Sequence, residues 1–169
     1  MVLLLLSSCL WSPPADAASG AGLRWRRHNP IAGLPTEAVI AGHNGDDSLA
    51  VCRLVADSGE RHAGWVMIRD DRRRCYASDG RETFVREDTF EVLVHHAAPT
   101  TTTPPADRTR WGRGAAVEVS GVSLCRCGED NLDLWVGQRR GGSCEGADAR
   151  LAPRSEAAND CDALLAPSL

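Results

Sequence analysis

The stretch "AGHNGDDSLAVCRL", Ala41–Leu54, places a polar, turn-forming run directly before an apolar run that carries a cysteine. Asn and Gly in the first half tolerate the positive φ angles of tight hairpin turns. As a calcium loop the stretch is poor, because it lacks the spaced series of ligands and the closing bidentate Glu. It therefore predicts a corner between two strands, with its polar side chains free to face a ligand.

Short apolar or alternating runs separated by Gly, Asn, Asp or Ser continue along the first half of the chain. They are EAVIAG, SLAVCRLVA, GWVMIR, RRCYAS and TFEVLVH, which begin at Glu37, Ser48, Gly64, Arg73 and Thr89. Such runs at regular spacing are typical of antiparallel β-sheets, so the sequence predicts an all-β protein. Near the C-terminus, EAANDCDALL (Glu156–Leu165) is compatible with a short helix.

The two halves of the chain resemble each other. A shift that places Trp25 on Trp111 also aligns Arg24 with Arg110, Gly42 with Gly128, Asn44 with Asp130, Asp47 with Asp133, Arg53 with Arg139 and Cys75 with Cys161. This agreement predicts two copies of one β unit, the second eroded and shortened. The second copy lacks a counterpart of Thr89–Val94 in this alignment. We expect the copies to pack together or to exchange strands, because an incomplete unit leaves strand surface uncovered.

Composition divides the chain into segments. Small residues and Pro predict a flexible tether after the N-terminus, and Thr and Pro predict an extended linker between the two units. The expected organisation is a signal and lipobox segment at 1–8, a tether at 9–22, a first unit at 23–96, a Thr/Pro linker at 97–108 and a second, degenerate unit at 109–169.

The N-terminus points to export. LSSC (Leu6–Cys9) resembles the lipobox of bacterial lipoproteins, which implies cleavage before Cys9 and lipid on that cysteine. The alternative is ordinary cleavage after Ala15-Asp16-Ala17. We expect a bacterial envelope protein held at the outer membrane or cell surface by its lipid anchor, or otherwise a periplasmic or secreted one.

The cysteine count supports the same compartment. Lipidation of Cys9 leaves six cysteines, a set suited to three disulfides: Cys52, Cys75, Cys125, Cys127, Cys144 and Cys161. Zinc is the rival use, but no CxxC pair occurs and the CRC of Cys125–Cys127 is tighter than usual zinc-ligand spacing. Cys52 and Cys75 lie in predicted strands of one unit, and we expect them to pair.

Charge and motifs exclude several functions. The 169 residues carry a net charge of −4, and all 19 basic residues are Arg, without the basic stripe expected of nucleic-acid binding. No nucleophile elbow, zinc-protease motif or phosphate loop occurs. We therefore expect neither catalysis nor a cofactor nor a metal.

The first half resembles the DM-nine repeat family in the order of its motifs. The matching positions are Trp25, Pro35, Ala38-Val39, Ala41-Gly42, Asn44 with Asp46, Leu49–Arg53, Gly64-Trp65, Gly80-Arg81-Glu82 and Phe90–Leu93. The resemblance implies small antiparallel β units in tandem pairs. Because the family includes mannose-binding lectins, it also implies carbohydrate recognition.

The resemblance also implies a set of ligand residues. Carried over by position, they are Asn44 with Asp46, Glu60 and Trp65 in the first unit, and Asp130 and Glu145 in the second. Trp65 stands where the family has Lys, so it would either stack on a sugar ring or plug the site. We expect Arg53 to pair with Glu82, and Trp25 and Trp111 to anchor the core.

These observations predict an exported envelope lipoprotein with a non-catalytic, lectin-like module for mannose-type or other cell-surface glycans. Two alternatives stay open. One is a structural envelope protein whose repeat has lost its ligand. The other is a protein-binding module, such as an enzyme accessory or inhibitor domain.

Overall fold

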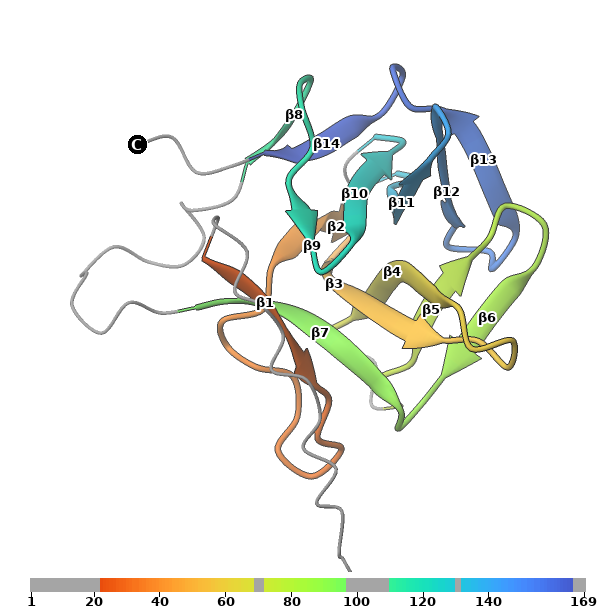
Figure 1. The fold of residues 1–169 in the computed structure, drawn as a ribbon. Coiled ribbons are helices and arrows are strands. Elements are labelled where there is room, and N and C mark those ends of the chain that lie inside the picture. Colours follow the sequence, from red (N-terminus) through yellow and green to blue (C-terminus); the bar gives the residue numbers. More distant parts are fainter. Residues whose placement is uncertain (1–21, 69–71, 97–109, 130–131, 166–169) are drawn as a thin grey trace, which may run out of the picture.

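The structure is a computed structural model, and it describes residues 22–68, 72–96, 110–129 and 132–165. These residues form two antiparallel sheets of seven strands each (Figure 1). The all-β prediction is confirmed, and no helix is found in the described ranges, so none there could cross a membrane. The helix expected at Glu156–Leu165 is wrong, since a turn joins two strands there.

The first sheet is built from the first half of the chain. Its strand order is β1-β7-β3-β4-β5-β6, and β2 pairs with β3. The strands are β1 (Leu23–Arg27), β2 (Ile40–Asn44), β3 (Asp47–Val55), β4 (Arg61–Met67), β5 (Cys75–Ser78), β6 (Thr83–Arg86) and β7 (Phe90–His95).

The second sheet repeats this topology. Its order is β8-β14-β10-β11-β12-β13, and β9 pairs with β10. The strands are β8 (Arg110–Gly112), β9 (Glu118–Val119), β10 (Val122–Cys127), β11 (Trp135–Arg140), β12 (Ser143–Ala147), β13 (Pro153–Ala157) and β14 (Asp162–Leu165). The strand β14 thus corresponds to β7, so the expectation that the second half lacks this strand is wrong.

Strand pairing shows which residues correspond. Trp25 lies opposite Leu93, and Trp111 lies opposite Leu164, as the sequence shift requires. Arg24 and Arg110 correspond as well, opposite Val94 and Leu165. Beyond β1 and β8 the ungapped shift fails, because the loops differ in length. By strand pairing, Arg53 corresponds to Arg126 and not to Arg139. Cys75 likewise corresponds to Cys144 and not to Cys161.

One apolar core joins the two sheets. Leu49 and Val51 of β3 point into it, together with Trp65 from β4 and Trp135 from β11. The alternate residues of β3, such as Leu54, belong to a second cluster on the opposite face of the first sheet. The period of two along β3 therefore buries both of its faces.

Two tryptophans cross-link the sheets through their indole N–H groups. Trp25 donates to the carbonyl of Val119, and Trp111 donates to that of Ile40, both at 3.1 Å. Trp25 is buried and Trp111 is half-buried against the same core, which agrees with their expected anchoring role.

Arginines stack on these two rings. The guanidinium of Arg53 lies 4.6 Å from the centre of the Trp25 ring, and that of Arg126 lies 5.5 Å from the Trp111 ring. Arg53 pairs with Glu91 at 2.5 Å, so the expected pairing with Glu82 is wrong. Glu91 lies directly opposite Arg53 in the pairing of β3 with β7, although the two residues are far apart in the sequence.

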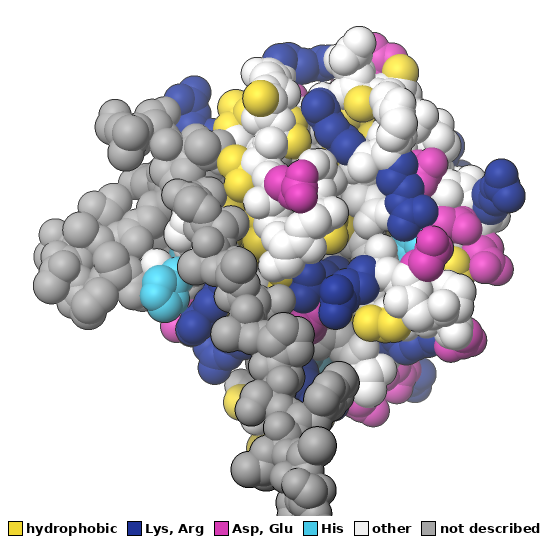
Figure 2. Space-filling model, in the orientation of Figure 1, with side chains coloured by type: hydrophobic (Ala, Val, Ile, Leu, Met, Phe, Trp, Pro, Cys, Tyr) yellow, Lys and Arg dark blue, Asp and Glu magenta, His cyan; other side chains and the backbone are white. Residues whose placement is uncertain are grey.

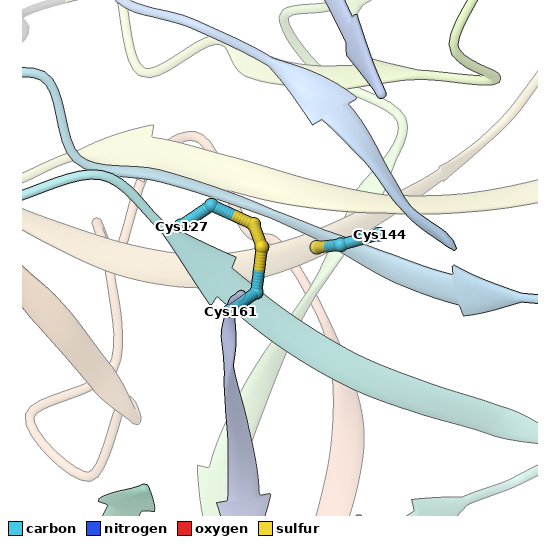
Figure 3. Close-up of side chains that lie close together, drawn as sticks. All are labelled: Cys127, Cys144 and Cys161. Carbon is cyan, nitrogen blue, oxygen red and sulfur yellow. A yellow bond between two sulfur atoms is a disulfide. The ribbon is translucent and has the colours of Figure 1, made fainter. Parts of the chain in front are cut away.

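Three disulfides staple the sheets, and the predicted Cys52–Cys75 pair is confirmed. The others are Cys125–Cys144 and Cys127–Cys161. Figure 3 shows Cys144 beside the Cys127–Cys161 bridge, and the three sulfurs lie within 4.8 Å of one another. All are disulfide-bonded, so they offer no thiolate to zinc in this state. Three disulfides are compatible with an oxidising, extracellular compartment.

Candidate functional site

Trp65 belongs to the core and not to a ligand surface. Its side chain is 0% exposed, its indole N–H donates to the carbonyl of Ala147 at 2.7 Å, and its ring lies 4.7 Å from that of Tyr76. The strand β4 places Trp65 on the face that meets the second sheet. Of the two roles left open for Trp65, stacking on a sugar ring is therefore wrong, whereas a side chain that fills the site is compatible with this burial.

The other residues predicted in the first unit do not converge. Asn44 pairs with Asp47 at the start of β3, whereas Glu60 precedes Arg61, which pairs with Val55 at the end of that strand. The rise of an extended strand puts these two ends about 26 Å apart. One sugar cannot bridge that distance. Asn44 instead donates to the carbonyl of Leu134 at 3.5 Å.

The remaining predicted residues are scattered as well. Asp46 is exposed at the tip of the β2–β3 turn. Glu145 lies in β12, with one carboxylate oxygen 3.9 Å from Nε of Arg140. Strand pairing makes Glu145 the counterpart of Tyr76 rather than of Glu60. Asp130 lies outside the described residues.

A cavity opens where two strands of the second sheet separate. In the first sheet, β3 and β4 stay paired through Ala50–Val66 and Leu49–Met67. In the second sheet, the β10–β11 ladder stops at Leu124–Gln138. The next residues of β10, Val122 and Ser123, pair with β9 but not with β11. The split leaves a space in the second sheet. Among its described strands, the first sheet has no equivalent space, because the corresponding strands stay paired.

We call this space the arginine cleft. Its volume is about 350 Å³, and it is lined by Gly59, Arg61, Ser120, Gly121, Val122, Ser123, Gln138, Arg139 and Arg140. The first two residues come from the first sheet's β3–β4 hairpin, so both sheets form the walls. Figure 2 shows arginine side chains at several places on one face of the molecule, many of them next to acidic side chains. Within the described part of the chain, no acidic residue lines this cleft.

A buried amide holds the walls of the cleft together. Gln138 is 4% exposed, and its Oε1 accepts a hydrogen bond from the backbone N–H of Ala63 at 3.2 Å. This bond fixes β11 against β4. Arg61 and Arg139 lie within two residues of its ends, so it also fixes the relative positions of their backbones.

The three arginines differ in their surroundings. Arg61 is exposed and has no ion-pair partner among the described residues. Arg139 is half-buried, and its Nη2 donates to the carbonyl of Ala158 at 3.0 Å. Arg140 lies near Glu145 at the distance given above. A guanidinium carries five donors, so each of these groups retains N–H groups for an anion.

The histidine next to Arg61 is neutral at neutral pH. Burial lowers the pKa of His62 below its usual value, and the charge of Arg140 lowers it further, against the opposing effect of Glu60. The imidazole stacks on Phe84 with ring centres 4.7 Å apart. The positive charge of the cleft near pH 7 therefore comes from its arginines.

Comparison with family models, with curated proteins and with solved structures found no match. The candidate site therefore depends on the geometry of this chain alone. Sequence reasoning missed Gln138, Arg139 and Arg140, although the adjacent pair of arginines before Gly141-Gly142 is visible in the sequence. The cleft itself has no local signal, because it arises from the loss of strand pairing.

Proposed function

We propose that this chain is an exported, non-catalytic module that binds acidic saccharides of the cell surface in the arginine cleft. The observation that carries the proposal is the split between β10 and β11, which is lined by three arginines from both sheets. The volume of the cleft lies within the range that is usual for small-molecule sites.

The chemistry of the lining favours an anionic ligand. Guanidinium groups bind carboxylate and phosphate in a bidentate manner, and such charged hydrogen bonds are about twice as strong as neutral ones. Ser120, Ser123 and Gln138 add groups that can bind sugar hydroxyls. The cleft has no aromatic side chain in its described lining, so we expect charge rather than ring stacking to drive binding.

A saccharide is also the ligand class that the DM-nine resemblance implies, but the arginine cleft lies away from the positions that the resemblance implies for the site. The family positions Asn44, Glu60 and Trp65 offer no common surface, for the reasons given above. A mannose-type ligand remains a proposal on resemblance alone, whereas the arginine cleft supports an acidic sugar on geometry.

Export and anchoring belong to the same proposal. The disulfides fit an oxidising compartment, and Cys9 of the lipobox-like segment would carry the lipid; that segment lies outside the described residues. Expressed in a bacterium, the full chain should partition into the detergent phase, and Cys9→Ser should abolish this partition. Cleavage after Ala17 without lipid would contradict anchoring and leave export intact.

Calorimetric titration with galacturonate, mannose 6-phosphate and mannose tests the function. We expect the two anionic sugars to bind, more weakly as salt rises, and mannose to bind far less. Arg139→Gln should weaken anion binding about tenfold, as expected for losing a charged hydrogen bond. Arg81→Gln, an exposed arginine outside the cleft, is the matched control.

Two other binding results would contradict parts of this proposal. Equal binding of mannose and galacturonate, unaffected by Arg139→Gln, would contradict the arginine cleft and favour a neutral-sugar site. No binding of any of the three sugars would contradict the saccharide proposal. It would favour the structural or protein-binding alternative.

A further inference from the structure

A second cavity lies across Arg61 from the arginine cleft. Its volume is about 310 Å³, and we call it the side cavity; its lining includes Arg27, Arg53, Val55, Arg61, Thr89 and Glu91. Arg61 lines both spaces. The β3–β4 hairpin thus forms a common wall, with Gly59 on the side of the arginine cleft and Val55 on the other side.

The side cavity offers a different chemistry. Val55 is 47% exposed although it is apolar, and it lies directly opposite Arg61 in the β3–β4 ladder. The charge of Arg53 is compensated by Glu91, with which it forms the buried ion pair described above. The cavity therefore combines an apolar surface with a hydroxyl from Thr89 and an acceptor from Glu91.

This combination matches a sugar ring. The C–H face of a pyranose needs apolar surface, and its hydroxyls need hydrogen-bond partners at the edge. The arginine cleft supplies the charge and the side cavity supplies the apolar contact. The side cavity also contains Arg27, but its exposed large apolar side chain, Val55, has no counterpart in the described lining of the arginine cleft, and Arg61 lines both spaces.

We propose that the natural ligand is an oligosaccharide of at least two units, with an acidic unit in the arginine cleft and the next ring over Val55 in the side cavity. This inference rests on the proposed function, because it takes the arginine cleft as the charged subsite. Arg61 is then the central contact, next to both units.

Binding of mono-, di- and trigalacturonate to the full chain tests the inference. We expect digalacturonate to bind about tenfold tighter than galacturonate, because burial of one apolar contact supplies a gain of this order. Trigalacturonate should gain little more. Val55→Ser should abolish most of the gain from the second unit and leave galacturonate affinity unchanged.

Two further variants separate the subsites. Arg139→Gln should weaken all three ligands by the same factor, because it acts on the charged subsite. Leu132→Ser, at an exposed apolar residue in the turn before β11, should change neither affinity nor length dependence.

The results distinguish this inference from the proposed function. If galacturonate binds and the second unit adds nothing, or if its gain survives Val55→Ser, the side-cavity inference is overturned and the charged site stands. If none of the galacturonates binds, the proposed function fails as well. Circular dichroism of each variant confirms that a lost affinity does not reflect unfolding.

Discussion

The backbone N–H of Ala63 donates its hydrogen bond to the side chain of Gln138, on the other sheet, instead of to a neighbouring strand. Ala63 lies opposite Arg53 on one side, but β5 begins to pair with β4 only at Gly64. The side chain of Gln138 thus accepts the hydrogen bond at a position of β4 where β5 is not yet paired. The bond ties together the two walls from which the arginines project.

Gln138→Met should destabilise the protein, because it removes the acceptor and leaves the N–H of Ala63 buried without a partner. The expected loss in the free energy of unfolding is about 1–3 kcal/mol, measured by urea denaturation. Galacturonate affinity should fall with it, because the arginines lose their common support. A variant as stable as the wild type would show that this bond does not hold the walls.

Glycines in the middle strands should tolerate no side chain. A Cβ on Gly64 would lie 1.8 Å from the carbonyl oxygen of Tyr76, and one on Gly137 would lie 1.9 Å from that of Glu145. These are corresponding positions, opposite Cys52 and Cys125. Gly64→Ala and Gly137→Ala should each cost about 3 kcal/mol or more, because backbone must move.

Gly45→Asn is the matched control for these glycine variants. Gly45 lies in an open turn with a φ of +59° and nothing within 4 Å of its Cβ position, and Asn tolerates this conformation. Its melting temperature should stay near that of the wild type. Equal losses in all three variants would indicate a general intolerance to glycine replacement.

Local sequence patterns predicted the strands well. Alternation and turn residues identified β3 and its hairpin with β2, and the Cys52–Cys75 bridge followed from two cysteines in one unit. Local patterns failed for features that depend on how strands pair and how the two sheets pack. Alternation shows that Trp65 faces one side of β4, but only the packing of the second sheet shows that this side is buried.

The same limit explains the missed cleft. The ungapped shift aligns Arg139 with Arg53, although Arg126 is the structural counterpart of Arg53. An alignment without gaps cannot accommodate loops of different length. The split between β10 and β11 is a tertiary feature, since the corresponding residues of β3 pair with both β2 and β4. The helix expected at Glu156–Leu165 failed similarly, because edge pairing with β12 and β10 overrides a weak helical preference.

Trp25→Phe and Trp111→Phe should each weaken the contact between the sheets. Phe retains the aromatic ring but loses the indole N–H, leaving the carbonyl of Val119 or Ile40 without that donor. The expected cost is about 1–2 kcal/mol each in urea denaturation, and more at Trp25 because it is fully buried. Unchanged stability in both variants would contradict the cross-linking role of these bonds.

Stability should fall as the pH drops below about 6.5, the usual pKa of histidine. Burial lowers the pKa of both His28 and His62 in the folded protein. The unfolded chain therefore binds protons first, and stability is lost as the pH falls from 6.5 toward the lowered values. His62→Phe should reduce the loss of stability between pH 7.5 and pH 5. Phe is a suitable replacement because the corresponding residue of the second sheet, Trp135, is also aromatic. An identical pH dependence in the variant would contradict the contribution of His62.

Titration of the ¹⁵N-labelled protein with galacturonate, followed by amide chemical shifts, shows whether an acidic sugar binds in the arginine cleft. We expect saturable shifts at Ser120, Gly121 and Ser123 and at Arg139 and Arg140, with Asn44 and Asp46 unchanged. Shifts confined to Asn44, Asp46 and Glu60, or no saturable shift at Arg139, would contradict binding in this cleft.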